Sequence, residues 1–80
     1  MTVQTSNRLQ EIFRVVFELP EGADVRELSQ STAPRWESLD HVTLVAAIES
    51  EFGVTLDAAD QLRMQSYAAT CAVLQEKGCE

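Results

Sequence analysis

The chain has 80 residues, of which 45% are hydrophobic and 24% are charged. This size and balance predict one globular domain, residues 1–80, whose core is too small for a large catalytic cleft. No apolar run approaches the ~18 residues that span a bilayer, and the first residues lack the basic start and apolar centre of a secretory signal. We therefore expect a soluble, cytoplasmic protein.

The charge of the chain is strongly acidic, with 13 acidic residues against 6 basic ones and a net charge of −7. Residues 36–60 contain acidic residues and neither Lys nor Arg. A nucleic-acid partner requires basic residues to neutralise phosphates, so this composition excludes that class. The acidic segment favours partners with basic patches; the alternative is that these charges only keep a small domain soluble.

The first helix is predicted from around Thr5 to Phe17, with Thr5 or Ser6 as its N-cap. Its apolar residues recur at helical spacing: Leu9, Ile12, Phe13 and Val16. Pro20 and Gly22 are expected to end this helix. The connection that follows, residues 18–37, is long for a compact domain.

That connection is predicted to contain one helical turn around residues 25–28, in which Leu28 pins the loop to the core. Pro34 prevents a continuous helix into the next element. The second helix is predicted from Ser38 to Phe52, and Gly53 suits the left-handed residue after its end. Its helical spacing predicts an apolar stripe that faces the core: Leu39, Val42, Val45, Ile48 and Phe52.

A short third helix is predicted from Asp57 to residue 62 or 63, and a fourth from Ser66 to Lys77, closed by Gly78. The inward face of the fourth helix is marked by Tyr67, Cys71 and Leu74. Residues 53–56 are interpreted as a packed connector because a lone strand has no partner. The predicted fold is all-α: a small four-helix bundle with three main helices, one short helix and a long first loop.

The two cysteines do not predict a disulfide or a metal site. If Cys71 and Cys79 both lie on the last helix, they are eight residues apart, about 12 Å along its axis, which is too far for a disulfide. We interpret Cys71 as a small core residue and Cys79 as a terminal thiol, consistent with a reducing compartment. With one histidine and no ligand cluster, we expect no bound metal.

Ser38 stands where the acidic loop turns into the second helix. Unpaired backbone N–H groups and the helix dipole favour a phosphate on its hydroxyl there, although serine is also a preferred N-cap. A catalytic triad of Ser38, Asp40 and His41 is excluded because the last two point about 100° apart on a helix. We therefore expect no enzyme activity, and we predict that His41 faces solvent and pairs with Glu37.

The segment Glu37-Ser38-Leu39, with the helix that continues to Val54, resembles the acyl carrier protein family. In that family a serine in an Asp-Ser-Leu motif at the start of the second helix carries phosphopantetheine. The resemblance implies that a phosphopantetheinyl transferase attaches 4'-phosphopantetheine from coenzyme A to Ser38, and that the arm tethers acyl groups as thioesters. Glu37 replaces the usual Asp, and Trp36 replaces a residue that is commonly small, which indicates a specialised, free-standing carrier.

The resemblance also implies a fatty-acid-like, polyketide or other specialised pathway, a monomeric state, and partners that are acyl-loading and acyl-processing enzymes with basic patches. It implies these recognition positions: Trp36, Asp40, His41, Thr43, Ala46, Glu49 and Ser50. Some apolar side chains are expected to shelter an acyl chain or simply to form the core: Val42, Ile48, Phe52, Met64 and Tyr67. Trp36 is predicted to pack over the top of the bundle beside Ser38, with exposure to partners as the alternative. Two other functions stay open: a peptidyl or aminoacyl carrier, and an acidic helical module that binds partners without a covalent group.

Overall fold

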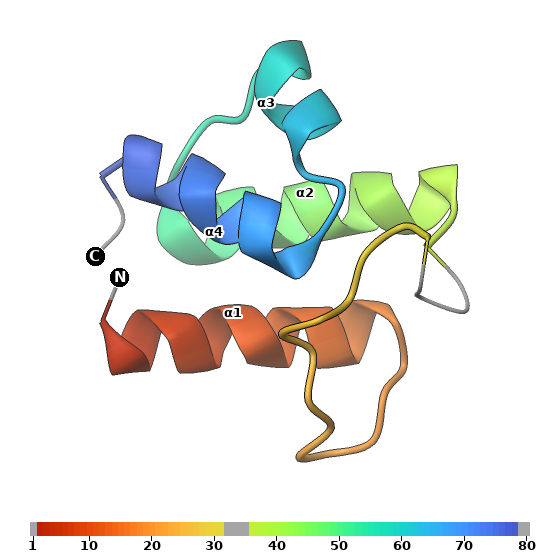
Figure 1. The fold of residues 1–80 in the computed structure, drawn as a ribbon. Helices are drawn as coiled ribbons and strands as arrows, with labels where there is room; N and C mark the ends of the chain where they lie inside the picture. The colour runs from red at the N-terminus through yellow and green to blue at the C-terminus, as the bar shows by residue number, and fades with distance from the viewer. Residues whose placement is uncertain (1, 32–35, 79–80) are drawn as a thin grey trace.

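A computed structural model describes residues 2–31 and 36–78 of the chain. It contains four helices: α1 (Val3–Val16), α2 (Ser38–Phe52), α3 (Ala58–Arg63) and α4 (Tyr67–Glu76). In Figure 1, α1 lies below α2 and α4, and the short α3 stands above them. Within the described ranges there is no strand, and one isolated antiparallel β-bridge joins Ser29 and Ser66. The predicted all-α fold class is confirmed.

The start of α1 differs from the prediction. The cap is Thr2, whose hydroxyl oxygen accepts a hydrogen bond from the Thr5 backbone N–H at 3.1 Å, so neither Thr5 nor Ser6 is the N-cap. Thr5 is instead buried inside the first turn. The helix therefore begins two residues earlier than its apolar spacing indicated.

Helix α1 ends at Val16, and backbone hydrogen bonds after its last turn end it before Pro20. Glu18 adopts a left-handed backbone conformation with φ of 55°. The Leu19 N–H then donates to the Arg14 carbonyl at 2.8 Å, and the Glu18 N–H donates to the Val15 carbonyl at 3.3 Å. These two bonds form a Schellman motif, a role for which glycine is the usual residue.

The bounds of α2 are confirmed, including its end at Gly53, where φ is 64°. The predicted apolar stripe is wrong in part, because the buried side chains are Leu44, Val45 and Ile48. Leu39 and Val42 are 76% and 62% exposed. At 100° per residue, Val42 lies about 160° around the helix from Leu44, so the two cannot both face α1.

The N-caps of α3 and α4 are the predicted residues. The Asp57 carboxylate accepts the Asp60 N–H at 2.8 Å, and the Ser66 hydroxyl accepts the Ala69 N–H at 3.0 Å. Gly78 follows α4 with φ of 86°. Residues 53–57 form no strand, and Leu56 packs into the core, which confirms the connector.

Four aromatic rings fill the centre of the molecule. The Phe13 ring lies 5.8 Å from Phe17, 5.7 Å from Trp36 and 5.3 Å from Tyr67, measured between centroids. Trp36 is only 8% exposed and also contacts Phe17, so the predicted packing of Trp36 is confirmed. The other buried hydrophobic side chains are Leu9, Val25, Leu44, Val45, Ile48, Leu56, Met64, Val73 and Leu74.

The long first loop is held to this core at residues 25–28. The Leu28 N–H donates to the Val25 carbonyl at 3.0 Å, which forms the predicted turn. Leu28 is half-buried, as expected, while Val25 is fully buried and is the deeper anchor. The Leu28 carbonyl also accepts the Tyr67 N–H at 2.9 Å, which joins the loop to the start of α4. The predictions for Pro34 and Cys79 lie outside the described residues.

Cys71 is half-buried on α4 as a free thiol, and burial raises its pKa. Among residues 2–31 and 36–78, no helix combines the length and the apolar character needed to cross a membrane.

Candidate functional site

Ser38 is the first residue of α2, and its side chain is exposed. The N-cap position is occupied by Glu37, whose backbone is extended, with φ of −96° and ψ of 174°. The Glu37 N–H donates to an Asp40 carboxylate oxygen at 3.3 Å, and the Glu37 carbonyl accepts the His41 N–H at 2.9 Å. Ser38 is therefore not the N-cap, and its hydroxyl makes no hydrogen bond within the part of the chain that the structure describes.

His41 does not have the environment that the sequence predicted. The Trp36 indole N–H donates to His41 Nδ1 at 3.1 Å, and His41 Nε2 lies 2.9 Å from the Gln61 carbonyl oxygen. A neutral imidazole that carries its proton on Nε2 satisfies both contacts. His41 is half-buried and does not pair with Glu37, because both of its ring nitrogens are directed elsewhere. The same geometry keeps the imidazole away from Ser38 and Asp40, so the three residues form no triad.

An open hollow of about 610 Å³ lies beside Ser38. Its walls are polar and apolar side chains from the first loop and α2: Gln30, Trp36, Glu37, His41 and Val42. A second, more apolar groove lies between α1 and α2, away from Ser38, and is lined partly by Ile12, Val15 and Val16. Of these two, the first hollow is the one that Ser38 lines.

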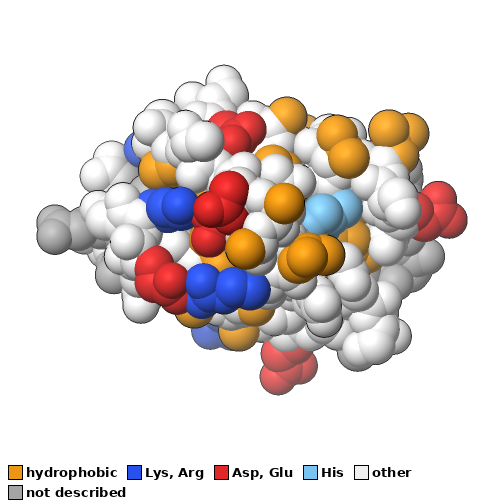
Figure 2. Space-filling model, turned by 90° about the horizontal axis from the view of Figure 1, so that it is seen from above, with side chains coloured by type: hydrophobic (Ala, Val, Ile, Leu, Met, Phe, Trp, Pro, Cys, Tyr) orange, Lys and Arg blue, Asp and Glu red, His pale blue; other side chains and the backbone are white. Residues whose placement is uncertain are grey.

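Exposed hydrophobic side chains adjoin the site. Leu39 and Val42 project from the first turns of α2, and Leu62 on α3 follows Gln61, the partner of His41. Figure 2 shows hydrophobic side chains around the single histidine on the face seen from above. Adjacent exposed apolar side chains mark a contact surface, whereas isolated ones are ordinary. Sequence periodicity missed this surface because it assigned Leu39 and Val42 to the core.

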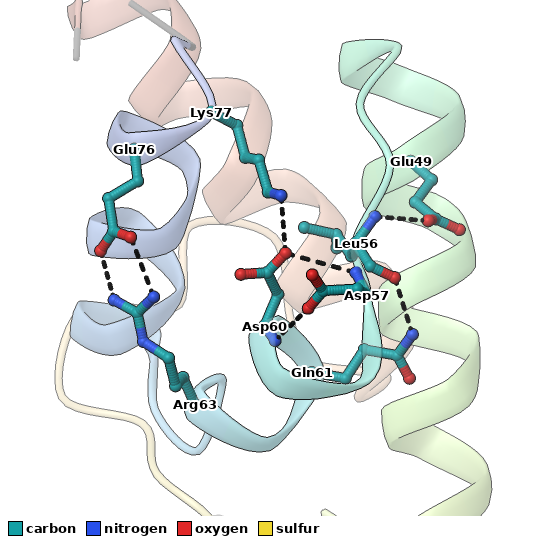
Figure 3. Close-up of polar contacts among 8 residues, drawn as sticks. All are labelled: Glu49, Leu56, Asp57, Asp60, Gln61, Arg63, Glu76 and Lys77. Carbon is teal, nitrogen blue, oxygen red and sulfur yellow. Dashed lines mark hydrogen bonds and ion pairs between the residues drawn. The ribbon is translucent and has the colours of Figure 1, made fainter.

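Several acidic residues of the 36–60 segment form hydrogen bonds or ion pairs with other parts of the chain. The Glu49 carboxylate accepts the Leu56 N–H at 2.8 Å, and Lys77 Nζ lies 2.7 Å from the Asp60 carboxylate (Figure 3). The Lys77 ammonium lowers the pKa of Asp60. Glu51 pairs with Arg8 at 2.6 Å. These charges are partly compensated, so the acidic surface available to a partner is smaller than the sequence count indicates.

The predicted recognition positions differ in exposure. Thr43, Ala46 and Ser50 are exposed on α2, and the Thr43 hydroxyl donates to the Leu39 carbonyl at 3.0 Å. Asp40, His41 and Glu49 are half-buried, and Trp36 is a core residue. A partner therefore reaches the exposed three directly, whereas the Trp36 ring is committed to the interior.

The five residues proposed to line an acyl chain do not form one surface. Ile48 and Met64 are fully buried and Tyr67 is nearly so. Phe52 is half-buried, with the Arg8 guanidinium 5.2 Å above its ring. Val42 faces outward, which contradicts a position between the helices. The interpretation as ordinary core fits Ile48, Met64 and Tyr67.

The chain is similar to an acyl carrier protein. It is 37% identical over 54 residues to "Acyl carrier protein 3, chloroplastic" of Cuphea lanceolata. The alignment covers 68% of this chain and 38% of that protein, so the chain spans well under half the length of this relative. No family model and no solved structure matches the chain. The likeness gives weak support to a relationship with the acyl carrier proteins and agrees with the resemblance of residues 37–54.

The residues around Ser38 fit a phosphopantetheine group. The hydroxyl is exposed and makes no hydrogen bond in the described part of the chain, and the hollow beside it is open. The first backbone N–H groups of a helix lack intrahelical partners, and the helix dipole is positive at this end, so both favour a phosphate. No group of three or more His, Cys, Asp or Glu side chains in the described ranges is arranged to hold a metal ion.

Proposed function

We propose that this protein is an acyl carrier, in which Ser38 bears 4'-phosphopantetheine. The observation that carries the proposal is the Ser38 side chain, which is exposed at the first residue of α2 while Glu37 and Asp40 fix the helix start. The similarity to a plant acyl carrier protein supports the same role. A carrier tethers a substrate and does not itself catalyse a reaction.

The chemistry required of the chain is limited to one hydroxyl. When a phosphopantetheinyl transferase acts, the Ser38 hydroxyl loses its proton and its oxygen bonds to the phosphorus next to the pantetheine. The diphosphate bond of coenzyme A breaks, and adenosine 3',5'-bisphosphate leaves. Once attached, the group supplies a terminal thiol that holds an acyl group as a thioester.

The partners of such a carrier are the transferase and the enzymes that load and process the acyl group. Their contact surface is proposed to comprise the exposed side chains around Ser38: Glu37, Leu39, Val42, Thr43 and Ala46. Acidic Glu37 and half-buried Asp40 favour basic patches on these enzymes. Apolar Leu39 and Val42 would add buried contact area.

Covalent loading tests this function. The protein is incubated with coenzyme A and a broad-specificity phosphopantetheinyl transferase, and the intact mass is measured. We expect the wild type to gain one phosphopantetheine and Ser38→Ala to gain none. Ser50→Ala is the matched control, since Ser50 is also exposed on α2, and it should load like the wild type.

Two results would overturn the assignment: no gain by the wild type with any competent transferase, or a gain by Ser38→Ala. Circular dichroism of the variant shows whether the helices are intact. A non-covalent interaction module would bind its partners without a mass change, so the same measurement separates the two functions.

A further inference from the structure

Helices α2 and α3 are bridged immediately beside Ser38. Trp36 donates its indole N–H to His41, and His41 in turn contacts the Gln61 carbonyl on α3, at 3.1 Å and 2.9 Å. The Trp36 and His41 rings are also stacked, with centroids 6.2 Å apart. We call Trp36, His41 and Gln61 the latch. The latch joins the loop before Ser38, the first turn of α2, and α3.

The far side of the latch is itself fixed. Figure 3 shows α3 tied to α4 by the Lys77–Asp60 and Arg63–Glu76 ion pairs. The Gln61 side-chain amide donates to the Leu56 carbonyl at 2.9 Å, which fastens α3 to its own connector. Moving α3 away from α2 breaks the His41–Gln61 contact, and moving it independently of α4 also breaks the two ion pairs.

The space behind the latch is filled by side chains. The Trp36 ring packs on Phe17 at 4.9 Å and on Phe13 at 5.7 Å between centroids. Ile48 and Met64 are fully buried in the same core. A group that entered the core between the first turn of α2 and α3 would have to displace the indole ring and break both contacts of the imidazole.

We propose that the latch keeps cargo attached through Ser38 outside the bundle, and so favours short acyl groups over long alkyl chains. This inference rests on the proposed carrier function. Cargo that stays outside the bundle meets the hollow beside Ser38, whose walls include the Gln30 amide and the Glu37 carboxylate as well as Val42. A short acyl group with a hydroxyl or amino substituent meets hydrogen-bonding groups and water there. A long alkyl chain can cover the exposed Leu39 and Val42 side chains, but the rest of its apolar surface stays in water, which is unfavourable.

The chain offers native reporters for a test. It contains two isoleucines, Ile12 and Ile48, and two methionines, Met1 and Met64. Methyl signals of Ile48 and Met64 report on the core, while Ile12, at the groove between α1 and α2, is the internal reference. Wild-type protein labelled with ¹³C at these methyl groups is loaded with acetyl- or octanoyl-phosphopantetheine, and intact mass verifies the loading.

For the wild type we expect the acetyl and octanoyl forms to share the same Ile48 and Met64 methyl signals and the same melting midpoint. His41→Ala removes the centre of the latch, and Trp36→Phe removes the N–H donor together with part of the indole while keeping one aromatic ring. In these variants the octanoyl form should have Ile48 and Met64 methyl signals shifted from those of the acetyl form, and it should melt at a higher temperature. The control is Gln75→Ala, which should behave like the wild type because Gln75 is exposed on α4 and belongs neither to the latch nor to the hollow.

The outcomes distinguish the two proposals. A wild type that never gains mass overturns the carrier function, and this inference with it. A loaded wild type whose octanoyl group shifts Ile48 and Met64 overturns the latch alone. Folded latch variants that show no octanoyl effect also overturn it, as does unfolding of both variants, because the contacts would then serve only stability.

Discussion

Truncation of Phe13 is expected to cause a large loss of stability, because its ring is fully buried among the rings of Phe17, Trp36 and Tyr67. Phe→Ala changes in cores cost about 3–5 kcal/mol. At roughly 0.05–0.15 kcal/mol per residue, the whole domain has about 4–12 kcal/mol of stability. Phe13→Ala should therefore remove about a quarter or more of the total, and it unfolds the protein if the total is near the lower bound.

The sharper test compares two phenylalanines of different burial. Phe52 is half-buried and partly covered by Arg8, so Phe52→Ala should cost only about 1–2 kcal/mol. Val15→Ala, on an exposed α1 position, should stay within about 0.5 kcal/mol. Urea unfolding followed by far-ultraviolet circular dichroism gives the three free energies. Equal losses for Phe13→Ala and Phe52→Ala would refute the assigned core.

Three further predictions concern the backbone, acid sensitivity and recognition. Glu18→Gly should raise stability by about 0.5–1 kcal/mol, because glycine adopts the left-handed conformation of this residue without strain; a lower urea midpoint would contradict this. The Lys77 ion pair lowers the pKa of Asp60 below its ordinary 3.8, so its stabilisation is present at neutral pH and is lost as the pH falls through the lowered value. Asp60→Asn should accordingly flatten the acid side of a plot of melting temperature against pH, and an unchanged slope would count against the pair. Transferase loading should slow as salt is raised, Thr43→Glu should speed it and Glu37→Gln should slow it; rates indifferent to salt and to both substitutions would place recognition away from α2.

Helix ends that depend on local chemistry were predictable from the sequence. Asp57, Ser66 and Gly53 lie at the caps expected of them, since each acts on backbone groups within a few residues. The start of α1 was not predictable in the same way. Thr2 and Thr5 have identical capping chemistry, and burial of Thr5 against the rest of the fold decides between them.

The inward face of α2 was harder to predict because apolar residues occur around most of its circumference. Periodicity allowed a stripe through Leu39 and Val42, whereas packing against α1 selects Leu44 and Ile48. The contact of His41 with Gln61 depends on where α3 docks, so no pattern within α2 indicates it. The exposed apolar residues and the latch beside Ser38 are therefore tertiary features.

The start of α2 holds Ser38 in place without using its hydroxyl. On one side, Asp40 binds the Glu37 N–H; on the other, the Trp36 ring is anchored in the aromatic core. Because Glu37 occupies the N-cap, Ser38→Ala removes no capping bond in the described structure and should change stability by less than about 0.5 kcal/mol. Failure of that variant to load would therefore reflect the missing oxygen nucleophile and not a disturbed helix, which makes Ser38 a residue whose chemical role is separable from its structural one.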